Sequence, residues 1–280
     1  MKVLHSILLA CVVFLTACGG GGKTMQTGAL SGNWQMTLQS TTLSETESQS
    51  GFLIQAGNTV TGSVQFSGQT FSDPMTGTTT TVCEGVGPAL GQTTGSNVAL
   101  VVSTAGQTVN LTGTSANNST SMSGNYSILA AGCGQTEIGT WTANQVIPLT
   151  GSFAATFTPY SSSEYTNVFH FTGMVTQGSN TGGSTTTLSG SMMSSDLPCF
   201  SSATLAGVVS GTSVVFNLLT PTGITLGKLS GTLTTDATQI NNAAFAFTNA
   251  TDPSVLGICD QMGIGTRGTA TIAVQPSSAT

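Results

Sequence analysis

Cysteines are the residues of this chain whose spacing most clearly predicts chemistry. Two of the six lie near the start, Cys11 inside an apolar run and Cys18 between that run and four glycines. The rest of the chain contains the other four, Cys83, Cys133, Cys199 and Cys259. An even number of cysteines in an exported chain predicts disulfides, and four cysteines permit three connectivities.

The first 18 residues have the layout of an export signal. A basic start with Lys2 and His5 precedes an apolar core at 7–15, which is shorter than the roughly 20 apolar residues of a membrane-spanning helix. The ending Leu15-Thr16-Ala17-Cys18 resembles the lipobox of bacterial lipoprotein precursors. The alternative is an ordinary signal peptide, cut near its Ala-x-Ala-like end, that leaves a free thiol.

The lipobox resemblance implies that residues 1–17 are a signal peptide and that Cys18 carries a diacylglycerol on its thiol and palmitate on its new amine. Several acyl chains, each contributing about 0.8 kcal/mol per buried CH₂, would hold the protein on a membrane. Residues 18–29 then form a glycine-rich tether. No Asp follows Cys18, which in the enterobacterial sorting pattern implies the outer membrane, with the body facing the periplasm or the cell exterior.

Composition limits the possible partners and fold classes. Only 5% of the residues are charged, whereas about a quarter are in an average protein. After cleavage the cations are Lys23, Lys228 and Arg267, so nucleic-acid binding has almost no electrostatic basis. Hydrophobic residues alternate with polar ones, and strand-favouring Thr and Val are frequent while Glu, Lys and Arg are scarce. The sequence therefore predicts an all-β protein.

The two halves of the chain resemble each other. LSGNWQMTLQ from Leu30 matches LTGSFAATFT from Leu149 at an offset of 119, and NLTGT from Asn110 matches KLSGT from Lys228 at an offset of 118. Each half contains two of the four body cysteines, which favours the bridges Cys83–Cys133 and Cys199–Cys259. The predicted domains are 30–146 and 147–275, followed by a tail at 276–280.

Short strand signals separated by turn residues follow one another in both halves. The first half predicts strands near 33–39, 51–56, 59–66, 79–83, 97–103, 107–114, 120–128 and 138–144. The second predicts strands near 151–158, 165–176, 184–192, 203–209, 212–219, 225–233, 239–248 and 267–274. Such an antiparallel up-and-down meander can close into a barrel, so the predicted fold is two tandem β-barrels related by duplication. Because the link at 142–149 is short, we expect the barrels to be close-packed or hydrogen-bonded edge to edge.

The opening Gly32-Asn33-Trp34 and later Thr-Gly pairs, such as Thr112-Gly113, are similar to avidin- and lipocalin-like barrels. This resemblance implies architecture only, because the polar ring that binds biotin has no residue-by-residue match. Both tryptophans, Trp34 and Trp141, are expected in the core, with an aromatic ligand shelf as the alternative. The other predicted inward-facing residues are Met36, Leu38, Val98, Leu100, Val102, Phe216 and Leu218.

Side chains that could carry catalysis or hold a metal are few. His170 is the only histidine after cleavage, and it is interpreted as a surface or cavity-mouth residue because no nucleophile-elbow motif accompanies it. Glu45 and Glu47 could hold an ion, although solvated loop charges are the favoured interpretation. Glu84 and Asp260 each follow a body cysteine and are expected to be structural. We therefore expect no enzyme activity, no cofactor and no metal.

The function predicted from these residues is that of a membrane-anchored, non-catalytic binding or structural protein of the cell envelope. One alternative is a carrier of a small hydrophobic ligand, with an apolar cavity inside a barrel. Another is a hydrolase, which would place His170 within hydrogen-bond reach of a carboxylate or hydroxyl in a cleft. The volume of the barrel interior distinguishes the carrier from a barrel filled by its own side chains.

Overall fold

The structure is a computed structural model that describes residues 29–42, 46–66, 69–72, 79–82, 84–104, 106–117, 119–130, 136–163, 166–180, 182–196, 201–247 and 266–277. All six cysteines, Glu45 and Asp260 lie outside these ranges, as do the predicted signal peptide and tether up to residue 28. The described residues contain no helix with the length and hydropathy that crossing a bilayer requires.

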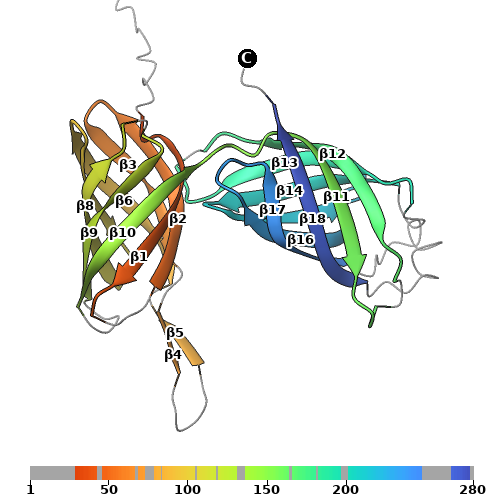
Figure 1. The fold of residues 1–280 in the computed structure, drawn as a ribbon, viewed down its shortest axis with the longest axis horizontal. Coiled ribbons are helices and arrows are strands. Elements are labelled where there is room, and N and C mark those ends of the chain that lie inside the picture. Colours follow the sequence, from red (N-terminus) through yellow and green to blue (C-terminus); the bar gives the residue numbers. More distant parts are fainter. Residues whose placement is uncertain are drawn as a thin grey trace, which may run out of the picture.

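The first half forms a closed antiparallel barrel, barrel 1, in which sequential strands are neighbours (Figure 1). Its eight strands are β1 (Gly32–Ser40), β2 (Thr46–Ala56), β3 (Thr59–Phe66), β6 (Gly85–Thr94), β7 (Asn97–Ser103), β8 (Gln107–Ser115), β9 (Ser121–Ala130) and β10 (Glu137–Val146). Strand β10 pairs with β1 and closes the barrel. A hairpin of β4 (Gln69–Ser72) and β5 (Thr79–Val82) projects below the barrel (Figure 1).

The second half forms barrel 2, which has the same meander without an inserted hairpin. Its eight strands are β11 (Gly151–Pro159), β12 (Phe169–Gln177), β13 (Thr186–Met193), β14 (Ser202–Ser210), β15 (Ser213–Leu219), β16 (Thr225–Leu233), β17 (Gln239–Phe247) and β18 (Arg267–Pro276). Strand β18 pairs with β11. The prediction of two tandem up-and-down barrels is confirmed.

One predicted strand of the first half is wrong. The signal near 79–83 was expected to supply a wall strand, but β5 belongs to the projecting hairpin, and the wall strand at this place is β6. Glycines and Pro88 hide the strand character of β6 in the sequence. The structure accommodates Pro88 because β6 pairs with β7 only from Ala89 onward, so the proline lies outside that part of the ladder.

Each barrel has one end that we call its far rim. In barrel 1 the far rim is where β1 ends and β2, β6 and β10 begin, at Ser40, Gly85 and Glu137, and the first described residue, Ala29, lies at the opposite end. In barrel 2 the far rim is where β11 ends and β12 and β18 begin, at Pro159 and Arg267. In the sequence, each of the four body cysteines falls between strands whose described ends lie on these rims.

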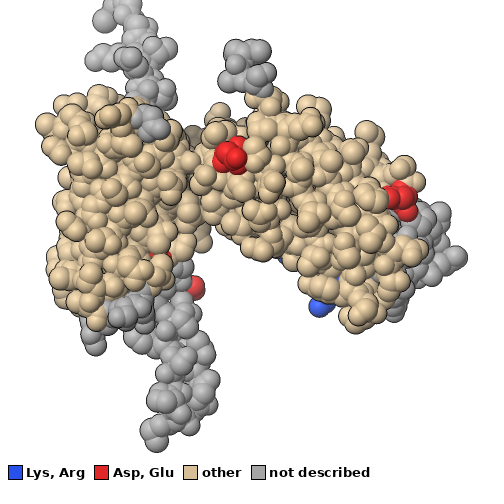
Figure 2. Space-filling view, in the orientation of Figure 1, with Lys and Arg blue, Asp and Glu red and all other residues tan. Residues whose placement is uncertain are grey.

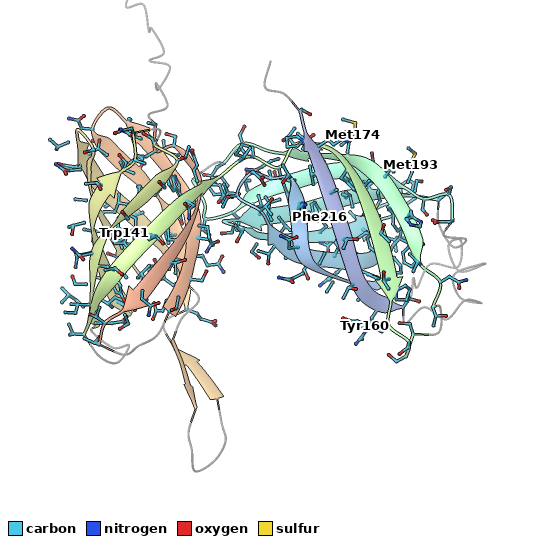
Figure 3. The ribbon with its side chains drawn as sticks, in the orientation of Figure 1. Trp141, Tyr160, Met174, Met193 and Phe216 are labelled. Carbon is cyan, nitrogen blue, oxygen red and sulfur yellow. The ribbon has the colours of Figure 1, made fainter. Side chains whose placement is uncertain are left out.

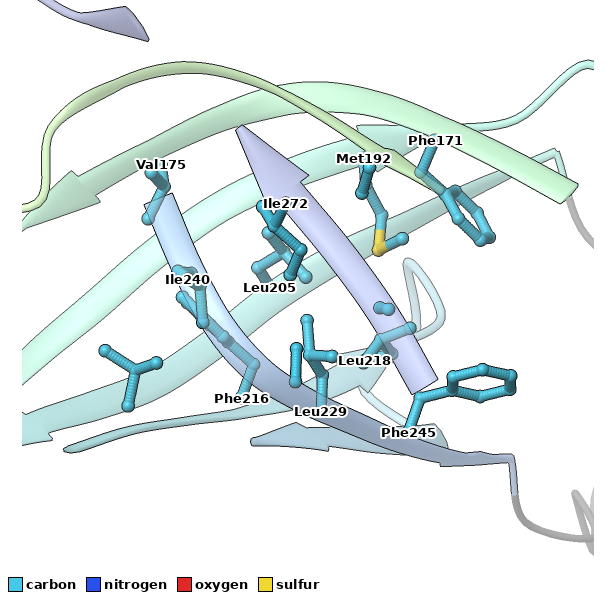
Figure 4. Close-up of a cluster of buried hydrophobic side chains, with 14 of the residues drawn as sticks. Phe171, Val175, Met192, Leu205, Phe216, Leu218, Leu229, Ile240, Phe245 and Ile272 are labelled. Atoms are coloured by element: carbon cyan, nitrogen blue, oxygen red, sulfur yellow. The ribbon is translucent and has the colours of Figure 1, made fainter. Parts of the chain in front are cut away.

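Side chains that point inward fill both barrels. In barrel 1, Trp34 and Trp141 are fully buried, so their assignment to the core is confirmed. Each indole nitrogen donates to a backbone carbonyl, Trp34 to Leu30 at 2.9 Å and Trp141 to Thr112 at 3.1 Å. In barrel 2 aliphatic side chains and phenylalanines interdigitate (Figure 4). On its outer face Met174 and Met193 point away from the barrel (Figure 3).

The barrels are docked, but they share no sheet. The turn between β14 and β15 in barrel 2 lies against β1 and β2 of barrel 1. The buried Asn33 side chain donates from Nδ2 to the Gly211 carbonyl at 2.8 Å and accepts from the Gly211 N–H at 2.8 Å. Gln35 Oε1 accepts from the backbone N–H of Thr212 at 3.1 Å, and the Ser50 and Ser210 hydroxyls lie 2.7 Å apart. Side chains of β1 and β2 therefore join barrel 1 to a turn of barrel 2. Of the two arrangements predicted, the described strands show close packing and no edge-to-edge pairing between the barrels.

Candidate functional site

A polar layer lies inside barrel 1 beneath its far rim. Its members are Ser40 at the end of β1, Glu47 and Gln49 on β2, Tyr126 on β9 and Glu137 at the start of β10. All but Glu47 are at most 5% exposed. Glu47 is half-buried, and its Oε1 atom is shielded from solvent. Polar side chains are rarely placed inside a closed barrel, so this layer is a candidate functional site.

Tyr126 is at the centre of the polar layer. Its ring lies over Gly139 of β10, where an added Cβ would be 2.6 Å from Tyr126 Cε1, so only glycine leaves room for the ring. The Tyr126 hydroxyl donates to Glu137 Oε1 and also interacts with Ser40. Burial raises the pKa of Tyr126 far above its usual value, and the negative charges of Glu137 and Glu47 raise it further. The phenol therefore stays protonated as a hydrogen-bond donor.

Gln49 is the member of the layer without a hydrogen bond from its side chain. It is 2% exposed, and neither Nε2 nor Oε1 has a partner. Strand pairing places it opposite Met36 and Phe66, both of which point into the barrel. Gln49 and Glu47 are two residues apart on one strand, so they share the inner face. A buried amide without partners costs free energy, which calls for an explanation at this position.

The same layer of barrel 2 is aromatic. On the first strands of the two barrels, Leu38 and Met36 correspond to Phe157 and Ala155. Glu47 lies opposite Leu38 and Phe169 lies opposite Phe157, so Glu47 and Phe169 are equivalent. Gln49 lies opposite Met36 and Phe171 lies opposite Ala155, so Gln49 and Phe171 are equivalent. Tyr126 is likewise equivalent to Phe245, since each lies opposite a glycine of the last strand, Gly139 or Gly268. In barrel 2 these side chains touch, with ring centroids 5.7 Å apart for Phe169–Phe171 and 5.6 Å for Phe169–Phe245.

These ring contacts show that side chains at the three positions converge when the backbone has this register. The first half of the duplication therefore gathers a carboxylate, an amide and a phenol where the second half gathers hydrocarbon. Retaining the fold does not require this exchange, since barrel 2 closes without it.

A second polar group lies on the outside of barrel 2. His170 Nδ1 is 2.7 Å from Asp196 Oδ2, and the backbone N–H of His170 donates to both oxygens of Asp196 at 3.0 and 3.1 Å. The backbone bond first, and then the side-chain bond, lowers the pKa of Asp196 to about 2. His170 also lines a surface groove of about 610 Å³ that crosses β11, β12, β17 and β18.

This pair satisfies one geometric condition of the hydrolase alternative, a carboxylate within reach of His170. It does not form a Ser-His-Asp triad, because the Ser194 hydroxyl donates to Asp196 at 2.7 Å rather than to His170. The His170 side chain is 62% exposed and that of Asp196 38%, so water competes for both. The pair is a surface hydrogen-bonded cluster, as the surface interpretation of His170 expected.

The interior of barrel 2 leaves little space. A cavity of about 20 Å³, room for one water-sized molecule, lies among side chains that are all apolar, including Phe153, Met192 and Phe216. Ligand pockets are commonly about 300–1,000 Å³. The apolar cavity of the carrier alternative is therefore present only as a space far smaller than such a pocket.

The other predicted site residues are placed as follows. Glu84 is exposed at the far rim of barrel 1. Glu47 lies on a strand with its side chain inside the barrel, so its interpretation as a solvated loop charge is wrong. The sequence interpretation missed Gln49, Tyr126 and Glu137. The available signal was their position in the alternating pattern of a strand, where they fall in phase with the buried apolar residues and therefore face inward.

The sequence matches no protein-family model and no curated protein sequence. Among solved structures, kievitone hydratase from Nectria haematococca aligns with 91% of this chain and 95% of its own, at 10% identity and a TM-score of 0.24. A similarity at this level carries no functional argument.

Proposed function

We propose that the chain is a lipid-anchored, extracytoplasmic envelope protein in which two filled β-barrels act as a rigid, non-catalytic binding or structural unit. The observation that carries the proposal is the packing of the barrel interiors. Phe157 contacts Phe169, Phe171, Phe245 and Phe247 in barrel 2, with ring centroids 4.8–6.4 Å apart. Because packed side chains occupy the barrel interior, a partner would bind to the outer faces or the rims.

The outer faces support a neutral partner. The visible face of the molecule is almost free of charged side chains (Figure 2). A cleft of about 380 Å³ between the barrels is lined by uncharged residues of both, most of them polar, among them Gln35, Ser48 and Thr212. A neutral polymer or protein of the envelope fits this surface better than a charged one.

A binding measurement separates this proposal from the carrier alternative. The delipidated body is titrated with a fluorescent fatty acid, and a lipocalin-type carrier serves as the positive control. We expect no saturable binding, because the interior of barrel 2 has room for little more than a water molecule. Leu205 lines the cavity, so Leu205→Trp would fill it. Saturable 1:1 binding to the wild-type protein that is lost in Leu205→Trp would overturn the proposal.

The anchor is tested separately with the full chain expressed in a Gram-negative host. Mass analysis is expected to show a diacylated and N-acylated Cys18 at the mature N-terminus, and the protein is expected in the membrane fraction. Cys18→Ser removes the thiol that accepts the lipid, so we expect it to lose acylation and membrane association. An unmodified Cys18 in the wild-type protein contradicts the proposal.

A further inference from the structure

We propose that the polar layer of barrel 1 binds one divalent cation, for which Ca²⁺ is the best candidate. The ligands are the carboxylates of Glu47 and Glu137, the amide oxygen of Gln49 and the hydroxyl of Ser40, and water completes the coordination. Tyr126 acts as a positioning residue that donates to Glu137. This inference goes beyond the proposed function and does not depend on the lipid anchor.

The first support is that these groups lie in one layer of barrel 1. The Tyr126 hydroxyl bonds to Glu137 and Ser40, and the charge of Glu47 acts on it. The equivalent phenylalanines of barrel 2 are in ring contact, so the side chains of Glu47, Gln49 and Tyr126 project toward the same region.

The second support is charge. Glu137 is 1% exposed, and the chain contains no Lys or Arg between residues 24 and 227. The cations of barrel 2, Lys228 and Arg267, are exposed on its outer face. A buried carboxylate is costly unless a proton or a cation balances it. No side chain of barrel 1 is positively charged, so a bound cation would supply the positive charge that the sequence of this barrel lacks.

The third support, independent of the carboxylates, is Gln49. Its buried side chain aims into the layer and has no hydrogen bond at either Nε2 or Oε1. In barrel 2 Phe171 occupies this place and needs no partner. An amide oxygen is a normal ligand of Ca²⁺, so a bound cation accounts for the polar side chain that packing alone would not select.

The donor set selects the metal. Every donor is oxygen, and hard cations such as Ca²⁺ prefer oxygen, whereas zinc sites use nitrogen and sulfur. Ca²⁺ also tolerates irregular geometry better than Mg²⁺. Among the described residues no group of three His, Cys, Asp or Glu side chains gathers, so this site has two carboxylates and neutral oxygens. Two carboxylates point to the weak range of extracellular calcium modules, about 10⁻⁴–10⁻³ M.

The layer lies where an ion can reach it. Glu47 is half-buried at the start of β2, directly beneath the far rim.

The test is a Ca²⁺ titration of the delipidated body after treatment with EDTA, followed by calorimetry and by thermal unfolding. We expect one site with a Kd in the range of about 10⁻⁴–10⁻³ M and a Tm that rises by about 5 °C at saturating Ca²⁺. Tb³⁺ in place of Ca²⁺ is expected to luminesce when Tyr126 is excited. Mg²⁺ is expected to bind at least about tenfold more weakly.

Variants separate a specific site from general charge. Glu137→Gln is expected to weaken Ca²⁺ binding at least about tenfold. Gln49→Met keeps the volume and removes the amide, so it is expected to weaken Ca²⁺ binding and to raise the stability of the metal-free protein. Asp236→Asn, which removes an exposed charge of barrel 2, is the matched control and is expected to leave binding unchanged.

The wild-type titration decides the proposal even where a variant does not fold. Absence of Ca²⁺ binding and of any Tm shift overturns it, and so does binding that Glu137→Gln leaves unchanged.

Discussion

Aromatic rings lying over mid-strand glycines recur in both barrels. Tyr126 covers Gly139, and Phe245 covers Gly268, where an added Cβ would be 2.7 Å from Phe245 Cε1. The ring fills the space that a side chain would occupy, so glycine and ring form one packing unit. The Thr-Gly pairs noted in the sequence include neither of these glycines, because Gly139 follows Ile138 and Gly268 follows Arg267.

Gly139→Ala should therefore be strongly destabilising. The new Cβ would collide with the backbone oxygen of Gln39 and with the ring of Tyr126, so we expect a loss of about 2 kcal/mol or more in the free energy of unfolding. Gly183→Ala is the matched control, because its nearest neighbour outside the adjacent residues is 3.7 Å away. Chemical denaturation should show less than about 0.5 kcal/mol for the control. Equal effects of the two substitutions would contradict this account.

The His170–Asp196 pair makes a prediction about pH. The Asp196 carboxyl should titrate with a pKa of about 2, below its usual 3.8. Because the folded-state pKa is lowered, the stabilisation is present above about pH 3.8 and is lost as the pH falls toward 2. His170→Ala keeps the backbone N–H that contributes most, so we expect the pKa to rise only part of the way. Carboxyl ¹³C NMR measures both values, and a full return to 3.8 would assign the effect to the imidazole.

At the scale of elements, hydrophobic alternation located most strands, and it failed where an insertion and a proline interrupt it. The second half kept its predicted order, and its loops at the end opposite to the far rim are short, at 178–185, 211–212 and 234–238. In the first half the sequence 79–83 has the β-propensity of a wall strand, whereas Gly85–Thr94 does not. Strand β6 belongs to the wall because closing the barrel requires a strand between β3 and β7, which its local composition does not indicate.

The turn between β14 and β15 is the element that fixes the barrels to each other. Asn33→Ala would leave the N–H and C=O of Gly211 without their partner in a buried position, which costs about 1–3 kcal/mol for each group. We expect faster amide exchange at Gly211 and a larger radius of gyration, while each barrel stays folded.

The control for this docking is Asn97→Ala, an exposed asparagine at the start of β7. It should change neither the exchange rate at Gly211 nor the radius of gyration. Gly211→Ala should act like Asn33→Ala, because its φ is 53° and an added Cβ would be 2.6 Å from Ser50 Cβ. Unchanged scattering for Asn33→Ala and Gly211→Ala would show that other contacts hold the barrels together.

At the scale of the whole molecule, duplication produced two barrels with one fold and two kinds of interior. The repeat was legible in the sequence because strand spacing and turn residues repeat at nearly constant offsets. The difference between the polar and the aromatic layer was not legible, since it appears only when registers align Glu47, Gln49 and Tyr126 with phenylalanines. Local pattern thus defines the meander, while the candidate site depends on which strands neighbour each other around the barrel.

The arrangement of the barrels also predicts how the four body cysteines pair. Barrel 2 contacts barrel 1 through its β14–β15 turn, at the end opposite to its far rim. Strand β14 has nine residues, and at about 3.3 Å per residue and a barrel tilt the two ends are on the order of 20 Å apart. Bridged cysteines need Cα atoms within about 7 Å. The described residues that flank the segments containing Cys199 and Cys259 are Asp196, Ser201, Phe247 and Thr266. They lie at the far rim, remote from barrel 1, which favours bridges within each barrel.

Peptide mapping without reduction should recover Cys83–Cys133 and Cys199–Cys259. The described neighbours of each pair, Glu84 with Ala130 and Ser201 with Thr266, lie on one far rim, so each bridge would close a rim without distorting the docking. Replacing one cysteine pair by serine should lower the stability of its own barrel by about 4 kcal/mol and leave the docking contacts intact. Peptides that join Cys83 or Cys133 to Cys199 or Cys259 would contradict this pairing.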